Sequence, residues 1–131
     1  MQSFFGQAHT LRCPEDNSRV REAVAQPGAE RVLVVDGGGL LRRALLGGNL
    51  AVIAAKNGWA GILVYGAVRD ASELKAVLLG IKALALCPLR TDKRGLGDAG
   101  VPVMISGQTV QPGDWVYADE DGVLISGAPL H

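Results

Sequence analysis

The chain has 131 residues, enough for one domain with a single modest hydrophobic core. Its 13 basic residues are balanced by 13 acidic ones, so it lacks the basic excess typical of proteins that bind nucleic acid directly. Hydrophobic residues make up 48% and charged residues 20%, the composition of a soluble globular protein. No apolar run is long enough for a membrane helix, and the first ten residues lack the pattern of a signal peptide. We therefore expect a cytoplasmic protein without membrane contact.

Strands and helices are predicted to alternate along the first two thirds of the chain. Strands are expected at residues 7–13, 31–35, 61–65 and 82–87, and helices from 17 or 18 to about 26, at 41–45, from about 50 to 58, and at 70–79. The apolar run 31–35 is typical of a strand that is covered on both faces. In the helix at 70–79, Leu74, Val77 and Leu78 form the apolar stripe.

The last third of the chain has a different character. Residues 88–100 are polar and rich in turn formers, which predicts a surface loop. Short strands separated by turn signals follow at residues 101–105, 108–110, 115–118 and 122–125. Without a repeat or a linker, the order indicates one α/β domain, residues 1–131, with a β-rich C-terminal third.

Glycines open the helix that follows the first buried strand. The segment Gly47-Gly48-Asn49-Leu50 places unpaired backbone N–H groups at a helix N-terminus, where they could hold a carboxylate or phosphate. Asp36 and three further glycines precede it. A glycine-rich connection that serves only chain geometry is the alternative interpretation.

Charged residues follow the second buried strand, 61–65. Arg69 could bind an anionic substrate in a bidentate manner, while Asp70 holds a hard cation such as Mg²⁺. Asp70 with Glu73 three residues later also matches a capping box, which stabilises the start of a helix by about 1 kcal/mol. The two interpretations are compatible.

Gly48, twenty residues, Arg69-Asp70, two residues and Glu73 together resemble the signature of the divalent-metal-dependent aldolases of the RraA-like family. The similar segments are CPEDNS, VLVVDGGGLLRRALLGGNLA, NGWAGILVYGAVRD, PLRTDKRGLGD and PGDWVYADEDGVLIS. The resemblance runs from about Phe5 to Ser126. Members of the family usually carry a helical segment before the first strand, and here the sequence begins almost at that strand, so trimer contacts or a lid from such a segment are not expected of these residues.

The resemblance implies a swivelling β/β/α domain that assembles as a homotrimer, possibly a hexamer, with sites at subunit interfaces. In such aldolases the loop that matches Gly47, Gly48, Asn49 and Leu50 binds the substrate through backbone groups. The residue at Arg69 stabilises the pyruvate enolate, the one at Asp70 binds Mg²⁺ or Mn²⁺, and the one at Glu73 supports the water shell of the metal or acts as base.

The implied reaction is cleavage of 4-hydroxy-4-methyl-2-oxoglutarate to two pyruvates, with oxaloacetate decarboxylation as a second activity. A 2-oxo acid can chelate Mg²⁺ through its carboxylate and ketone oxygens, and the metal then draws charge onto the ketone oxygen as the C–C bond breaks. Arg69 would stabilise that charge more strongly in the transition state than in the ground state. Both reactions pass through the same enolate.

Two other functions remain open. The regulatory branch of the family binds and inhibits ribonuclease E without chemistry, and retention of Asp70 and Glu73 favours the enzyme. The name methyltransferase is also attached to the family, and residues 34–39 faintly resemble a nucleotide-binding glycine loop. That segment lacks the usual spacing and a following acidic strand end.

Several conspicuous residues are expected to be structural. Isolated His9 and His131 do not predict a zinc site, and residues 119–121 are expected to form a solvated turn. The other residues with structural expectations are Cys13 and Cys87 as small buried side chains, Arg42 and Arg43 on a solvated helix face, Arg90, Lys93 and Arg94 in a surface loop, and Trp59 and Trp115 in the core or an interface.

Overall fold

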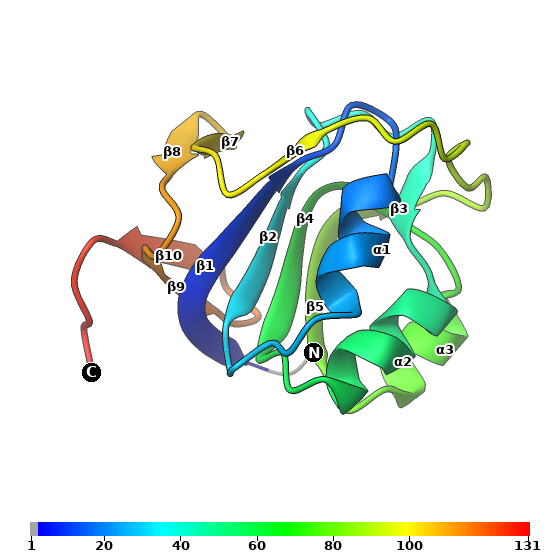
Figure 1. The fold of residues 1–131 in the computed structure, drawn as a ribbon. Helices are drawn as coiled ribbons and strands as arrows, with labels where there is room; N and C mark the ends of the chain where they lie inside the picture. Colours follow the sequence, from blue (N-terminus) through cyan, green and yellow to red (C-terminus); the bar gives the residue numbers. More distant parts are fainter. Residues whose placement is uncertain (1–2) are drawn as a thin grey trace.

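The computed structural model describes residues 3–131, and a largely parallel sheet lies at the centre of the molecule (Figure 1). The strands are β1 (Phe4–Arg12), β2 (Val32–Asp36), β3 (Ala44–Leu46), β4 (Gly61–Val68), β5 (Gly80–Leu86), β6 (Asp98–Ala99), β7 (Val103–Ile105), β8 (Gln108–Val110), β9 (Trp115–Ala118) and β10 (Val123–Ser126), and the helices are α1 (Ser18–Val24), α2 (Gly48–Lys56) and α3 (Ala71–Ala76). The main sheet has the order β10-β9-β1-β2-β4-β3, with β5 paired to β4 and β6 to β1, while β7 and β8 pair separately.

Both faces of the central strands are buried, as the apolar run 31–35 predicted. Leu33 and Val35 of β2 point into a core shared with the helices, whereas Val32 and Val34 point into a second core shared with β7 to β10. Burying each such side chain stabilises the fold by about 2 kcal/mol. Figure 1 shows the helices on one side of the sheet and the small strands on the other. This α/β arrangement, with a β-rich C-terminal third, agrees with the predicted β/β/α fold.

The helix predicted at 41–45 is absent, and the prediction was wrong. Residues 44–46 form β3, which pairs in parallel with β4, and the backbone N–H of Ala44 donates to the carbonyl of Leu89 at 2.7 Å. All three β3 side chains are buried. A helix cannot bury three consecutive residues equally well, so packing decided against the local pattern.

The helix predicted at 70–79 is much shorter than expected. It covers Ala71–Ala76, and Val77 is already extended as the chain turns towards β5. Leu74 and Val77 pack against the core as predicted, but the side chain of Leu78 is 87% exposed. Six residues make too few turns to present a continuous apolar stripe to the sheet.

The other predicted elements lie within a few residues of their predicted positions, whereas the short strand β6 lies in the predicted loop 88–100 and was missed. Helix α1 begins at Ser18, although its N-cap residue Asn17 makes no capping hydrogen bond and instead accepts one from the buried hydroxyl of Thr91. Both cysteines are free; Cys13 is buried and Cys87 half-buried. Among residues 3–131, no helix is long and apolar enough to cross a membrane.

Candidate active site

The predicted site residues meet where two parallel strands end side by side. Strand β3 leads into Gly47 and Gly48, and β4 leads into Arg69 and Asp70. The backbone N–H of Arg69 donates to the carbonyl of Leu46 at 2.9 Å, which fixes the two strand ends together. In open α/β sheets the carboxyl ends of the strands are the usual place for a ligand.

Asp70 links the two strand ends through its side chain. Its Oδ2 accepts a hydrogen bond from the backbone N–H of Gly48 at 3.0 Å. Its backbone is left-handed, with φ 63° and ψ 50°, and its side chain makes no capping hydrogen bond to α3. The capping box predicted for Asp70 and Glu73 was therefore wrong, because the carboxylate faces the start of α2 rather than that of α3.

The left-handed backbone at Asp70 is a conformation that L-residues adopt at a cost, although Asp and Asn tolerate it better than most. Such strain is typically held in place at functional sites by the structure around it. Here Gly48 holds the side chain of the strained residue by a hydrogen bond, and the Arg69–Leu46 backbone hydrogen bond fixes the residue before it.

Glycine is required at positions 47 and 48 because side chains of the site pack against them. A Cβ at Gly47 would lie 2.8 Å from Asp70 Oδ2 and 2.9 Å from Arg69 Nε. A Cβ at Gly48 would overlap the carboxylate of Glu73 and lie 2.9 Å from its Cβ. The glycine pair thus lets all three charged side chains approach the start of α2, which is more than a matter of chain geometry.

The Arg69 guanidinium is held loosely and remains available. Its Nε lies 3.9 Å from Asp70 Oδ2, and the two side chains are 34% and 29% exposed. An ion pair of this length and exposure contributes little to stability. Among residues 3–131 the guanidinium has no hydrogen-bond partner, so its donors are free to bind an anion.

The start of α2 offers backbone donors beside these side chains. Gly47 is the extended N-cap residue, and the N–H of Ala51 donates to its carbonyl at 3.1 Å. The N–H groups of Asn49 and Leu50 belong to the first helical turn and have no partner within the described part of the chain. Such groups, with the positive end of the helix dipole, suit a carboxylate.

The donor groups of this site fit a divalent cation whose coordination is completed by water and substrate. Across the described residues, no three His, Cys, Asp or Glu side chains cluster closely enough to hold a metal by themselves. Asp70 has one carboxylate oxygen occupied by Gly48 and the other without a partner in the described chain. Mg²⁺ is usually held by one or two carboxylates, with water and substrate oxygens completing its shell. The donor set therefore fits Mg²⁺ or Mn²⁺ bound together with substrate rather than in a protein cage.

A pocket beside Arg69 contains residues whose role the sequence did not reveal. The pocket has a volume of about 390 Å³ and is lined by Arg43, Arg69, Pro88, Leu89, Arg90 and Asp92. Arg43 was expected on a helix face and Arg90 in a surface loop. They come together because Ala44 forms a parallel bridge with Arg90, a long-range contact that local pattern does not disclose.

The glycines that follow Asp36 serve the fold. Asp36 accepts hydrogen bonds from the backbone N–H groups of Gly38 at 2.8 Å and Met104 at 3.1 Å. Gly37 and Gly39 both donate to the carbonyl of Tyr65. These contacts tie the loop to β4 and to β7, so the faint resemblance of residues 34–39 to a nucleotide-binding loop has no support in its geometry.

The architecture and the site define an α/β domain that joins a helix N-terminus, an arginine and a carboxylate at the ends of two strands. The model of the RraA-like family, described as Aldolase/RraA, matches residues 1–125, and the chain belongs to this family. A protein of Ectopseudomonas mendocina, 58% identical over 98% of this chain and 79% of its own length, carries the provisional name 4-hydroxy-4-methyl-2-oxoglutarate aldolase. A protein of Alkalilimnicola ehrlichii with the same name is 55% identical over 94% of this chain and 76% of its own length.

Solved structures share the same fold. The RNA-processing inhibitor RraA from Thermus thermophilis is 49% identical, with a TM-score of 0.96 over 100% of this chain and 80% of its own. A structure from Geobacillus kaustophilus, titled as an S-adenosylmethionine: 2-dimethylmenaquinone methyltransferase, is 42% identical, with a TM-score of 0.94 over 99% of this chain and 81% of its own. These structures confirm the predicted fold class.

Proposed function

We propose that this chain is a divalent-metal-dependent aldolase that cleaves 4-hydroxy-4-methyl-2-oxoglutarate to two molecules of pyruvate, with oxaloacetate decarboxylation as a second activity. The observation that carries the proposal is the meeting of Gly48, Arg69 and Asp70 at two strand ends. The names of relatives more than half identical over nearly the whole chain support the same reaction.

The residues divide the chemistry between them. The N–H groups of Asn49 and Leu50 bind the carboxylate next to the ketone, because they are unpaired and at the positive end of α2. Arg69 donates to the ketone oxygen, where negative charge develops as the bond between C3 and C4 breaks. Asp70 holds Mg²⁺ or Mn²⁺, which when bound supplies Lewis-acid polarisation of the ketone.

The cleavage also requires a base. The proton of the C4 hydroxyl must leave as the C3–C4 electron pair moves onto the pyruvate fragment, and we assign its acceptance to Glu73, directly or through water. The Glu73 side chain lies against Gly48 and has no partner within residues 3–131. One pyruvate forms as the C4–O bond becomes a ketone, and return of the accepted proton to C3 of the enolate gives the other.

Assembly of copies of this chain is part of the proposal. Strand β5 lies at the edge of the sheet, and Leu84 and Leu86 of this strand are 50% and 63% exposed. Together with Leu74 and Val77 they line an apolar groove. Exposed apolar edges of this kind mark contact surfaces. We propose that a neighbouring copy covers this groove in a homotrimer, possibly a hexamer, and also encloses the open site. The proposed location of this assembly is the cytoplasm.

Inhibition of ribonuclease E is a second candidate function. It rests on the 49% identity and near-identical fold of the RNA-processing inhibitor RraA from Thermus thermophilis. A binding role of this kind requires no chemistry at Asp70, so the two functions predict different results when that carboxylate is changed.

The test is pyruvate release from 4-hydroxy-4-methyl-2-oxoglutarate and from oxaloacetate, with Mg²⁺ and with a chelator. A protein-free blank at equal Mg²⁺ is essential because oxaloacetate decarboxylates slowly with metal alone. The proposal expects metal-dependent turnover well above the blank. Rates equal to the blank for both substrates would contradict the aldolase proposal and favour the regulator. The regulator is tested by measuring whether the wild-type chain inhibits ribonuclease E.

A further inference from the structure

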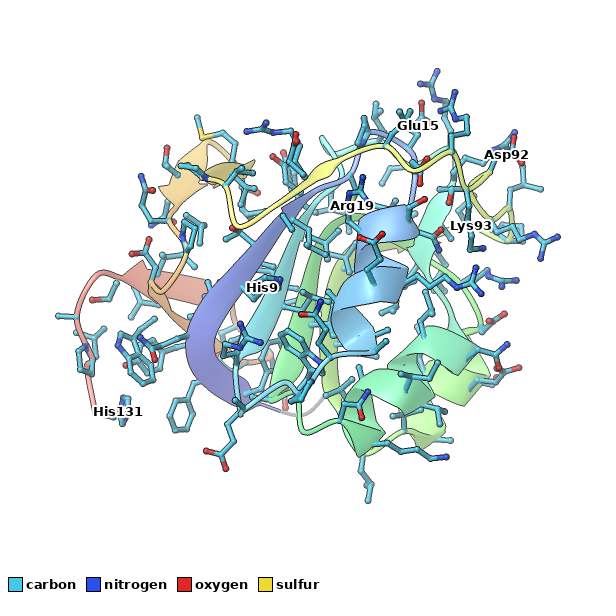
Figure 2. The ribbon with its side chains drawn as sticks, in the orientation of Figure 1. His9, Glu15, Arg19, Asp92, Lys93 and His131 are labelled. Carbon is cyan, nitrogen blue, oxygen red and sulfur yellow. The ribbon has the colours of Figure 1, made fainter. Side chains whose placement is uncertain are left out.

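The pocket beside Arg69 carries an excess of positive charge. Arg43, Arg69 and Arg90 supply three guanidinium groups to its lining, and Asp92 supplies one carboxylate. Figure 2 shows Asp92 projecting from the loop after β5, at the same end of the molecule as Glu15. The lining is completed by Pro88 and Leu89.

Two of the three arginines of this pocket, Arg43 and Arg90, have no ion-pair partner within residues 3–131. In the described residues neither Arg43 nor Arg90 has a carboxylate within 4.0 Å, and the one contact of the Arg43 guanidinium is a long hydrogen bond of 3.4 Å to the carbonyl of Arg42. The adjacent Arg42 differs, because both oxygens of Glu15 accept from it at 2.6 and 3.0 Å. Arg42 therefore has a carboxylate partner, whereas its neighbour Arg43 has none among the described residues.

We propose that Arg43 and Arg90 form a second carboxylate subsite, which binds the end of the substrate remote from its ketone. This inference rests on the proposed function. Arg69 lines the pocket and also adjoins Gly47 and Asp70, so one substrate can contact the catalytic centre and the pocket at once. Arginine is well suited to a carboxylate because its planar guanidinium donates two parallel hydrogen bonds.

The subsite binds the second carboxylate that both proposed substrates carry. The carboxylate next to the ketone binds the start of α2, and the ketone binds Arg69 and the metal. The second carboxylate binds Arg43 and Arg90. Asp92 opposes this binding by repulsion and limits the affinity. Monocarboxylic 2-oxo acids of the same length leave the two arginines without a partner and bind more weakly.

The experiment compares binding of 2-oxoglutarate and 2-oxopentanoate by calorimetry in the presence of Mg²⁺. The two probes have equal length and differ in one terminal carboxylate, and neither carries the hydroxyl needed for cleavage. We expect wild type to prefer 2-oxoglutarate. The variant R43A/R90A should lose roughly 10- to 100-fold in affinity for it, as expected for charged hydrogen bonds, and little for 2-oxopentanoate. D92N should bind 2-oxoglutarate more tightly.

Arg94→Ala is the control. It removes one guanidinium, where R43A/R90A removes two, from the neighbouring pocket, whose lining includes Arg42 and Arg43 but not Arg69, and should leave the preference unchanged. Equal weakening for both probes in R43A/R90A, or no weakening, would overturn the subsite even if pyruvate release is observed. A preference for 2-oxoglutarate that R43A/R90A abolishes supports the subsite even if wild type fails to cleave, in which case only the aldolase proposal falls.

Discussion

The carboxylate of Asp70 accepts a hydrogen bond from the backbone N–H of Gly48, 22 residues earlier in the chain, at 3.0 Å. This contact joins the end of β4 to the start of α2 and leaves the second oxygen of Asp70 open. A carboxylate aimed at the neighbouring strand end does not cap its own helix, and the Asp70 backbone is left-handed instead of extended as is usual for an N-cap residue.

Replacing Asp70 by Asn separates catalysis from structure. Asn tolerates the left-handed backbone and its side-chain oxygen can still accept from Gly48, but it lacks the charge that holds a divalent cation. We expect pyruvate release to fall to the protein-free rate, with the free energy of unfolding changed by less than about 1 kcal/mol. D70A should lose more stability, because alanine is less tolerant of this backbone. Full metal-dependent turnover by a folded D70N protein would exclude Asp70 as the metal ligand.

Replacing Gly48 by Ala should displace Glu73. The added Cβ overlaps the Glu73 carboxylate, so we expect a loss of about 1–3 kcal/mol in the free energy of unfolding, measured in urea, together with loss of turnover. Removing the carboxylate in G48A/E73A should restore part of the stability and none of the activity, because the Cβ at position 73, 2.9 Å from the added Cβ, remains. Gly122→Ala is the control, because its Cβ would meet nothing within 4 Å. If G48A and G122A are equally stable, the packing assigned to Glu73 is wrong.

Replacing Arg69 by Lys keeps the charge and removes the planar donors. We expect kcat to fall by roughly 10²- to 10³-fold, the usual cost of losing a donor to a developing oxyanion, with a much smaller change in KM. Stability should hardly change, because Arg69 makes only a long, exposed ion pair. A rise in KM alone would mean that Arg69 binds the substrate without acting on the transition state.

Protonation of Asp16 should lower the free energy of unfolding at acidic pH. Burial raises the pKa of this fully buried carboxyl, but hydrogen bonds from the Ser18 hydroxyl and from the backbone N–H groups of Ser18, Arg94 and Leu96 outweigh it and lower the pKa to about 2. Because the unfolded chain then binds the proton more readily, the stabilisation is complete above about pH 4 and is lost as the pH falls towards 2.

The measurement for Asp16 is urea unfolding between pH 5 and pH 2. D16N should be less stable than wild type at pH 5 and should lose less stability as the pH falls. The control D98N changes an exposed carboxylate whose ion pair with Arg12 is 3.5 Å long, and it should follow the wild-type curve. Parallel curves for D16N and wild type would show that another group controls acid sensitivity.

A charge introduced into the apolar groove along β5 should disrupt the proposed assembly. Leu86→Glu places a carboxylate on a side chain that is 63% exposed and lines the groove, so we expect it to shift the sedimentation coefficient from an oligomer to a monomer. Leu124→Glu is the control, since Leu124 is similarly exposed at 55% but belongs to β10 at the opposite edge of the sheet. A wild-type chain that sediments as a monomer would contradict the proposed assembly.

Strong local patterns were sufficient for much of the fold. The apolar runs that became β2 and β4 could be recognised because strands buried on both faces contain few polar residues. The short C-terminal strands were separated by clear turn signals. Residues 44 and 45 were wrongly predicted as helix because the conformation of β3 depends on pairing with β4 and contact with Leu89, which are distant in sequence.

By itself, the sequence determined the types and spacing of the site residues, from Gly47 and Gly48 to Arg69, Asp70 and Glu73. Spacing follows from the covalent chain, and it sufficed to indicate a strand-end site and the family. Only the tertiary structure decided that Asp70 faces Gly48 instead of capping α3, and that Arg43 and Arg90 share a pocket with Arg69. Both depend on which strands lie side by side, and that choice is made by burial summed over the whole sheet rather than by any local segment.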